Sequence, residues 1–212
     1  MSGLSLAKKR AVPGQTGVPV PAGRQTTAGP QTSAEPIQQT EAVPPASRFD
    51  TLAEDILSGS LTGPLAPIAE AICGGRTTEA ASLASQTVVL AARALGPRHP
   101  EVLTLGELSA YIAYLTGDVR HACELSLNLA YRHRESADPT AAYANVLSAA
   151  AAWRAIPDPG VALPLGHTLT TLWTLLTTEP GPASTDDPHL LESAHARLPR
   201  LAARARAHGA SG

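Results

Sequence analysis

The sequence repeats a turn that is followed by a helix, and this repeat limits the possible folds more than any other feature. Residues 75–80 (Gly-Arg-Thr-Thr-Glu-Ala) match residues 117–122 (Gly-Asp-Val-Arg-His-Ala) at an offset of 42, and residues 158–162 (Asp-Pro-Gly-Val-Ala) match residues 118–122 at an offset of 40. Repeats of this length are typical of stacked supersecondary units. The turn residue recurs because antiparallel helices reverse sharply, and the alanine recurs because the two helices then approach closely. The pattern predicts an all-α stack of antiparallel helical hairpins.

The composition agrees with helices and disfavours a β-sheet fold. Aromatic residues make up 3% of the 212 residues, and alanine and leucine are the most frequent types. Sandwiches and barrels draw on β-branched and aromatic residues, whereas alanine and leucine are strong helix formers. The arginine-rich, lysine-poor and alanine-rich usage also indicates a bacterial source with a GC-rich genome.

Glycine, proline and aspartate divide the chain into helices. Asp-Pro pairs at Asp138, Asp158 and Asp187 each place a capping aspartate before a proline at the first helical position. Asp118, Asp50 and Thr77 are predicted to cap three further helices. The expected helices cover residues 48–58, 64–73, 77–94, 100–115, 118–134, 139–155, 159–178 and 188–208.

Residues 1–47 differ from the rest of the chain. They are rich in proline, glycine, threonine and glutamine and contain one aliphatic cluster. Such a segment buries too little apolar surface to offset its ordering entropy, so we expect a disordered N-terminal arm. Its first residues are either a short docking motif or a solvated terminus; the candidate motif is Leu4, Leu6, Lys8, Lys9 and Arg10.

The unit of helix, Gly-x-x-x-x-Ala and helix resembles a tetratricopeptide repeat. The period of 42 and the linker at residues 95–102 (Leu-Gly-Pro-Arg-His-Pro-Glu-Val) are similar to the long-linker variant of kinesin light chains and many bacterial proteins, which carries Leu-Gly-x-x-His-Pro between units. The resemblance covers residues 62–177. It implies a right-handed α-solenoid with flanking helices: a repeat domain over residues 48–178, a linker over 179–187 and a C-terminal capping helix over 188–208.

The resemblance also implies a groove lined by the first helix of each hairpin, which would hold a peptide or a partner helix. Tyr111 and Tyr114 are about one helical turn apart and share a face, where tyrosines suit an interface. The alternative is that they pack against the neighbouring repeat. The groove positions carried over from the family are Thr104, Glu107, Tyr111, Tyr114, Leu115, Tyr143, Asn145 and Arg154.

Residue types that carry chemistry are present, but their spacing matches no common catalytic or metal-binding motif. His121 and Cys123 are two apart on a helix and point to different faces, and there is no Cys-x-x-Cys or His-Glu-x-x-His. The sequence also lacks Gly-x-Ser-x-Gly and a phosphate-binding glycine loop. We therefore expect no catalytic residue, no metal site and no cofactor. Both cysteines are expected to be small buried thiols, and Glu107 a solvated surface carboxylate.

The last predicted helix is expected to cover the end of the stack. Trp153 and Trp173 are expected to seal the core there, beneath an apolar stripe formed by Leu190, Leu191, Leu198 and Leu201. Pro199 should kink or split this helix. Acidic residues stand at the start of this helix and arginines toward its end, which is the order that the helix dipole favours. We prefer this explanation of the arginines to a nucleic-acid or membrane-binding patch.

The sequence is most consistent with a cytoplasmic scaffold or adaptor that binds a protein or peptide partner through the groove. The formal net charge of −2 provides no attraction to nucleic acid, and no apolar run reaches the length of a membrane span. Two alternatives stay open: a peptide-sensing regulatory protein, or a structural component of a larger assembly docked by its arm. Three repeats are near the minimum for a stable stack, so a homo-oligomer is a further option.

Overall fold

The computed structural model describes residues 46–209, which belong to one compact unit, Ala42–Gly212. This range contains helices and no strand, so the prediction of an all-α fold is confirmed. The elements are α1 (Arg48–Ser58), η1 (Gly63–Leu65), α2 (Ala66–Cys73), α3 (Thr77–Leu95), α4 (Pro100–Leu115), α5 (Val119–Glu135), α6 (Pro139–Ala155), α7 (Pro159–Thr177), η2 (Pro182–Ser184) and α8 (His189–Gly209).

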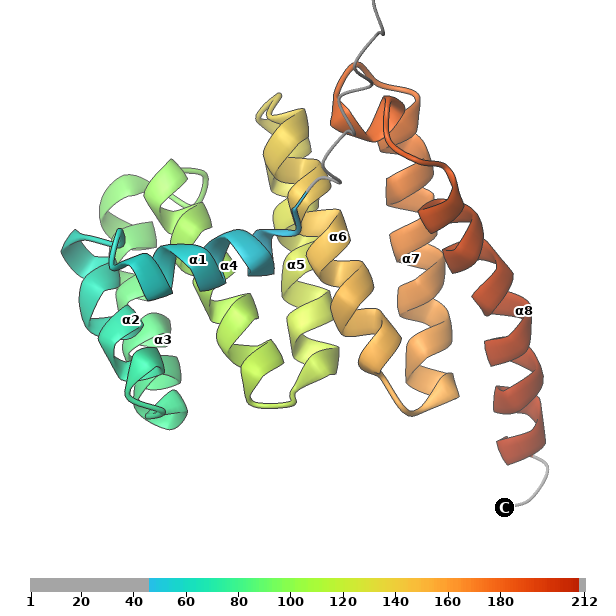
Figure 1. The fold of residues 1–212 in the computed structure, drawn as a ribbon, viewed down its shortest axis with the longest axis horizontal. Coiled ribbons are helices and arrows are strands. Elements are labelled where there is room, and N and C mark those ends of the chain that lie inside the picture. The colour runs from blue at the N-terminus through green and yellow to red at the C-terminus, as the bar shows by residue number, and fades with distance from the viewer. Residues whose placement is uncertain (1–45, 210–212) are drawn as a thin grey trace, which may run out of the picture. The chain divides into compact units, whose positions relative to one another are not determined.

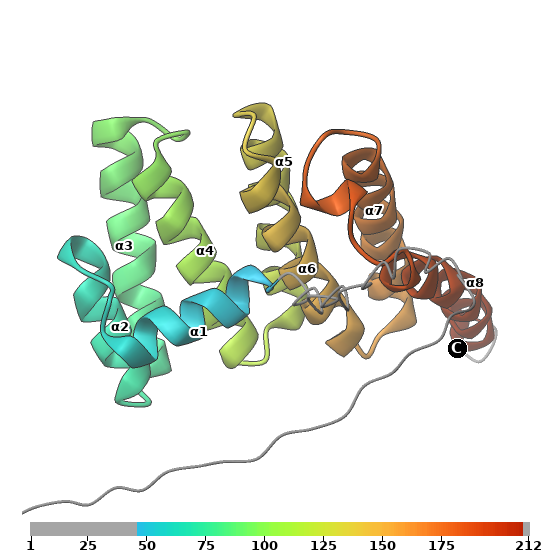
Figure 2. The same cartoon turned by 45° about the horizontal axis from the view of Figure 1, so that its top comes forward.

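From α2 onward, each α-helix packs against the next one along the chain. Successive helices from α4 to α7 run in alternating directions and lie side by side (Figures 1 and 2). Helix α1 is the exception, because it crosses α2, α4 and α6. Within the described range no single helix is long and apolar enough to cross a membrane. Helix α1 and the segment Gly63–Cys73 would be long and apolar enough only if they are counted together, and the chain bends by 89° between them.

Three of the aspartates predicted to begin helices do cap them. The side chains of Asp118, Asp138 and Asp158 accept hydrogen bonds from backbone N–H groups in the first turns of α5, α6 and α7. Asp187 accepts a hydrogen bond from the N–H of His189, the first residue of α8. These contacts satisfy donors that a helix cannot satisfy itself, which is why the sequence marks them so clearly.

Two predicted caps were wrong. Ser47, not Asp50, caps α1, while Asp50 bonds back to the Ser47 backbone from the third helical position and completes a capping box. Thr77 is the first residue of α3 rather than its cap, and Arg76 precedes it without a side-chain capping bond. Both helices nevertheless begin at or beside the expected residue.

The core near the C-terminal end of the stack is covered by α8, as expected. Trp153 and Trp173 are buried, and Leu198 and Leu201 of α8 are buried with them. Leu190 was expected to join this cover but is 44% exposed. Pro199 was expected to kink or split α8. The helix is not split, because α8 continues as one element through that residue, and the kink stays a prediction. Leu198 and Leu201, on either side of Pro199, both pack into the core.

Helices α6, α7 and α8 approach one another closely at Gly166. A β-carbon placed on Gly166 would lie 2.5 Å from Cζ2 of Trp153 and 2.8 Å from Cδ2 of Leu198. The indole cannot easily move, because its Nε1–H donates a 2.6 Å hydrogen bond to the carbonyl of Ala162. Glycine is therefore required here by packing between helices rather than by its own backbone angles.

Replacing Gly166 by alanine should lower the free energy of unfolding by about 1–3 kcal/mol, the usual cost of overpacking a core. Urea denaturation followed by circular dichroism measures this loss. Gly160→Ala is the control on the same helix, because its β-carbon would meet only the side chain of Asp158, at 3.3 Å, and no residue of another helix. Equal stability of the Gly166→Ala variant and the control would contradict the close packing described above.

The two cysteines differ in a way that the sequence did not predict. Cys123 is buried as expected, and burial together with the charge of Glu124 raises the pKa of its thiol to about 12. Cys73 is exposed at the end of α2, so the expectation of a second buried thiol was wrong. It follows the last buried residue of a short helix and has too few neighbours to cover it.

A thiol-reactive chromophore should therefore label one cysteine in the folded protein and two in urea. Cys73 should react within minutes, because it is exposed, whereas Cys123 should stay protected until the chain unfolds. A Cys73→Ser variant should abolish the native-state signal. Rapid native labelling of that variant would show that Cys123 is accessible.

Candidate helix-binding face

Helix α1 lies across a face shared by α2, α4 and α6 (Figures 1 and 2). Its buried residues are Phe49, Leu52 and Ile56, which recur at steps of three and four and form one stripe. Leu57, just outside this stripe, is 83% exposed. The first helices of the three predicted hairpins thus present one surface, and an amphipathic helix already occupies part of it. We call this surface the helix-binding face.

Three of the predicted groove residues contact this bound helix directly: Glu107, which is described below, and the two tyrosines. The ring of Phe49 stacks on Tyr114 with 5.0 Å between centroids and is tilted against Tyr111 at 5.7 Å. Aromatic pairs at these distances add stability beyond their buried area. The tyrosines share a face, as their spacing predicted, and an internal helix covers that face.

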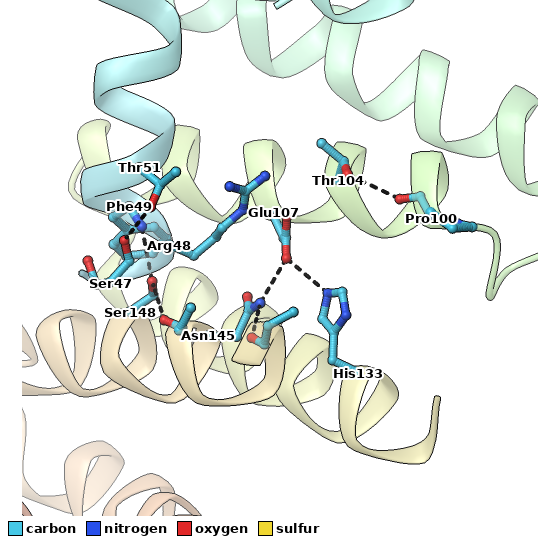
Figure 3. Close-up of polar contacts among 12 residues, drawn as sticks. Ser47, Arg48, Phe49, Thr51, Pro100, Thr104, Glu107, His133, Asn145 and Ser148 are labelled. Carbon is cyan, nitrogen blue, oxygen red and sulfur yellow. Dashed lines mark hydrogen bonds and ion pairs between the residues drawn. The ribbon is translucent and has the colours of Figure 1, made fainter. Parts of the chain in front are cut away.

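A buried carboxylate anchors the first turn of α1 (Figure 3). Glu107 of α4 accepts a 2.6 Å charged hydrogen bond on Oε2 from Nε of Arg48. Its Oε1 lies 2.9 Å from Nε2 of His133 in α5 and accepts a 2.8 Å hydrogen bond from Nδ2 of Asn145 in α6. Both carboxylate oxygens are therefore engaged, by groups from three other helices.

Glu107 was expected to be solvated, and the structure contradicts this. The residue is 3% exposed. Burial alone would raise the pKa of its carboxyl, but hydrogen bonding to His133, the charge of Arg48 and hydrogen bonding to Asn145 outweigh burial and hold the pKa below its ordinary value of 4.5. A buried charge is tolerated only when it is paired and hydrogen-bonded, and this carboxylate meets both conditions.

The backbone of α1 is also fixed at its start. The N–H of Phe49 donates a 3.1 Å hydrogen bond to Oγ of Ser148 in α6, at a buried position (Figure 3). This N–H is one of the first four in the helix and has no partner within α1. Side chain and backbone therefore both tie the first turn of α1 to the helices beneath it.

Open clefts lie on both sides of this first turn. One has a volume of about 630 Å³ and is bounded by Arg48, Thr51, Thr104, Glu107 and His133, among others. The other has a volume of about 290 Å³ and is bounded by Phe49, Asp50, Tyr114, Arg154 and Leu190, among others. The face is therefore partly accessible even while α1 occupies it.

The remaining predicted groove residues have different surroundings. Tyr143 is buried, its hydroxyl donates to Asp186, and its ring lies edge-on to Trp173, so it belongs to the core. Asn145 is buried beneath Glu107, and Leu115 is exposed at the end of α4. The candidate docking motif Leu4, Leu6, Lys8, Lys9 and Arg10, and the predicted arm up to residue 45, lie outside the described residues.

Sequence reasoning missed three residues of this site: Arg48, His133 and Ser148. The sequence feature that could have identified two of them is a polar residue on an otherwise apolar face of a helix. His133 follows Ala130 by three and Ser148 follows Asn145 by three, so each continues a buried stripe. A polar residue in such a stripe needs an internal partner, and here the partners come from other helices.

In the described part of the chain, no three histidine, cysteine or acidic side chains are grouped so that they could hold a metal ion. Comparisons with protein-family models, with curated proteins and with solved structures found no significant match to this chain.

Glu107→Gln removes the charge and keeps the shape of the side chain. We expect the free energy of unfolding at pH 7 to fall by about 2 kcal/mol, as is typical for hydrogen bonds to charged groups. Because the folded state lowers the pKa of Glu107, its contribution is complete above pH 4.5 and is lost as the pH falls through the folded-state pKa. Urea titrations at pH 7 and pH 3 should show the wild-type and variant stabilities converging in acid.

Glu124→Gln is the matched control for this experiment. Glu124 pairs with Arg120 on the exposed surface of α5, at 2.8 Å. Exposed pairs of this kind contribute little, so the urea midpoint should not move. A Glu107→Gln variant that behaves like this control would mean that the buried network does not stabilise the fold.

Proposed function

We propose that the chain is a non-enzymatic adaptor whose helical hairpins form a tetratricopeptide-like α-solenoid. In this proposal the helix-binding face of α2, α4 and α6 holds an amphipathic helix from a partner protein. The repeated turn-helix pattern and the sequential packing of α2 to α8 support this proposal. Helix-in-groove recognition uses aliphatic and aromatic anchors on one helical stripe.

One observation carries the proposal: the face holds a short amphipathic helix of this chain. Helix α1 buries its apolar stripe there and leaves Glu54 and Leu57 toward solvent. Its polar contacts to the face are an ion pair with Glu107, a backbone hydrogen bond to Ser148 and a 3.8 Å contact from Sγ of Cys73 to the carbonyl of Ile56. Such a small set of contacts can be reproduced by another helix.

The contacts of α1 define the chemistry of the partner. A basic residue at the first helical position would reach Glu107, as Arg48 does, and an aromatic residue directly after it would stack on Tyr114. Aliphatic residues three and seven positions after the aromatic would replace Leu52 and Ile56. We propose that the partner carries this pattern on one face of a helix.

A partner helix must compete with α1, which is covalently linked to the face. The linkage gives α1 an effective concentration on the order of 1 mM. Binding from solution therefore depends on how tightly α1 is held. A substitution that weakens the contacts between α1 and the face should therefore strengthen the binding of an added helix, although no residue of the face itself has changed.

The test uses a fluorescent peptide with the sequence of residues 46–60 and the full-length chain. Truncating a buried phenylalanine costs about 3–5 kcal/mol, so Phe49→Ala in the chain should release α1 and tighten peptide binding at least tenfold. Fluorescence anisotropy measures the affinity, and circular dichroism checks that the variant is folded.

Two controls make this result specific. Leu57→Ala alters an exposed position of α1 and should leave the peptide affinity unchanged. A peptide that itself carries Phe49→Ala should bind neither chain. A folded Phe49→Ala chain that binds the natural peptide no better than wild type would contradict the proposal that this face accepts helices in trans.

A further inference from the structure

A group of arginines gathers where α8 passes the C-terminal end of α6. Arg197, Arg200 and Arg204 are spaced by three and four residues, so they lie along one face of α8 over roughly 10 Å. The guanidinium of Arg197 lies 4.5 Å from the ring centre of Trp153, the residue before Arg154. Burial and the charges of Arg154, Arg204 and Arg200 lower the pKa of Arg197, which agrees with this clustering. We call these four residues the arginine patch.

None of the patch arginines forms an ion pair with any residue in the range 46–209. Elsewhere in that range, several arginines do pair with a carboxylate: Arg48, Arg76, Arg98, Arg120 and Arg134. Like charges held together repel one another, and the contact of Arg197 with the Trp153 ring offsets this only in part. The patch thus concentrates positive charge that the described part of the chain does not neutralise.

The helix dipole does not explain the whole patch. A cation is stabilised within the last turn of a helix, and Gly209 ends α8 well beyond Arg197 and Arg200. Packing does not explain it either, because Arg200 and Arg204 are exposed. A surface that keeps unpaired arginines in a row is suited to a ligand with several negative charges.

We propose that the arginine patch docks an acidic segment of a partner protein. A nucleic acid fits less well, because single-stranded binding relies on exposed aromatic rings, and Trp153 at the patch is 1% exposed. The N-terminal segment of this chain also fits poorly, because Lys8, Lys9, Arg10 and Arg24 outnumber Glu35 and Glu41. Aspartate and glutamate side chains offer the planar carboxylates that arginine binds best. Arg154 also bounds the smaller cleft beside the first turn of α1, so the patch adjoins the helix-binding face there. The proposal rests on the arginines of α8 and does not depend on that face.

The experiment measures binding of a labelled twelve-residue peptide with six glutamates to the full-length protein, by fluorescence anisotropy at low salt. The test variant is Arg200→Gln/Arg204→Gln, which leaves Arg197 on Trp153 and alters only exposed residues. We expect the dissociation constant to rise about tenfold. The same peptide with glutamine in place of glutamate should not bind.

The control is Arg93→Gln/Arg132→Gln, which removes the same charge at α3 and α5, from arginines that also lack an ion pair in the described range. Arg132 hydrogen-bonds to Asn128 and to the carbonyl of Pro97, so circular dichroism checks that the control is folded. This control should change the dissociation constant less than twofold. An equal loss in both variants would overturn the proposal, because it would show attraction by net charge alone. Tighter binding of a twelve-nucleotide single strand than of the acidic peptide would also overturn it and would identify the patch as a nucleic-acid surface.

Discussion

The carboxylate of Glu107 is the point where four helices meet, and the placement of α1 depends on it. Glu107 comes from α4, and its partners Arg48, His133 and Asn145 come from α1, α5 and α6. A buried charge without partners would be expensive, so each of these helices must stay where it satisfies the carboxylate. Apolar side chains alone would let α1 slide along its groove. We infer that the charged contact sets the register of α1 and that the stacked rings of Phe49 and Tyr114 then complete the fit.

The helices themselves were largely predictable, because their ends are local features. Asp118, Asp138 and Asp158 cap helices within three residues of their own position, and no distant part of the chain is needed to place them. The error at the start of α1 was also local in cause. At α1, serine and aspartate bond to each other reciprocally, and either could have been the cap by residue type alone. At Pro199 the local sequence was a poor guide: α8 is not split there, and Leu198 and Leu201 on either side of the proline are buried in the core.

The site was predictable only in part, because its decisive contacts join residues far apart in sequence. Repeat spacing placed Glu107, Tyr111 and Tyr114 on one helix and Asn145 on the next hairpin. Nothing local indicated that α1 would turn back across them: the Arg48–Glu107 contact spans 59 residues and the Phe49–Ser148 contact spans 99. Tyr143 was misplaced for the same reason, since its partner Asp186 lies in the loop before α8.

The path of α1 has a consequence for synthesis on the ribosome. Hairpins such as α4 and α5 can pair as soon as both helices have emerged, because their contacts are close in sequence. Of the helices described, α1 emerges first, yet the contacts of its first turn are complete only when Ser148 has been made, 99 residues after Phe49. At about 5–20 residues per second, this leaves the apolar stripe of α1 without its full native cover for roughly 5–20 s. The nascent chain therefore passes through an interval in which α1 is available to chaperones and to neighbouring nascent chains.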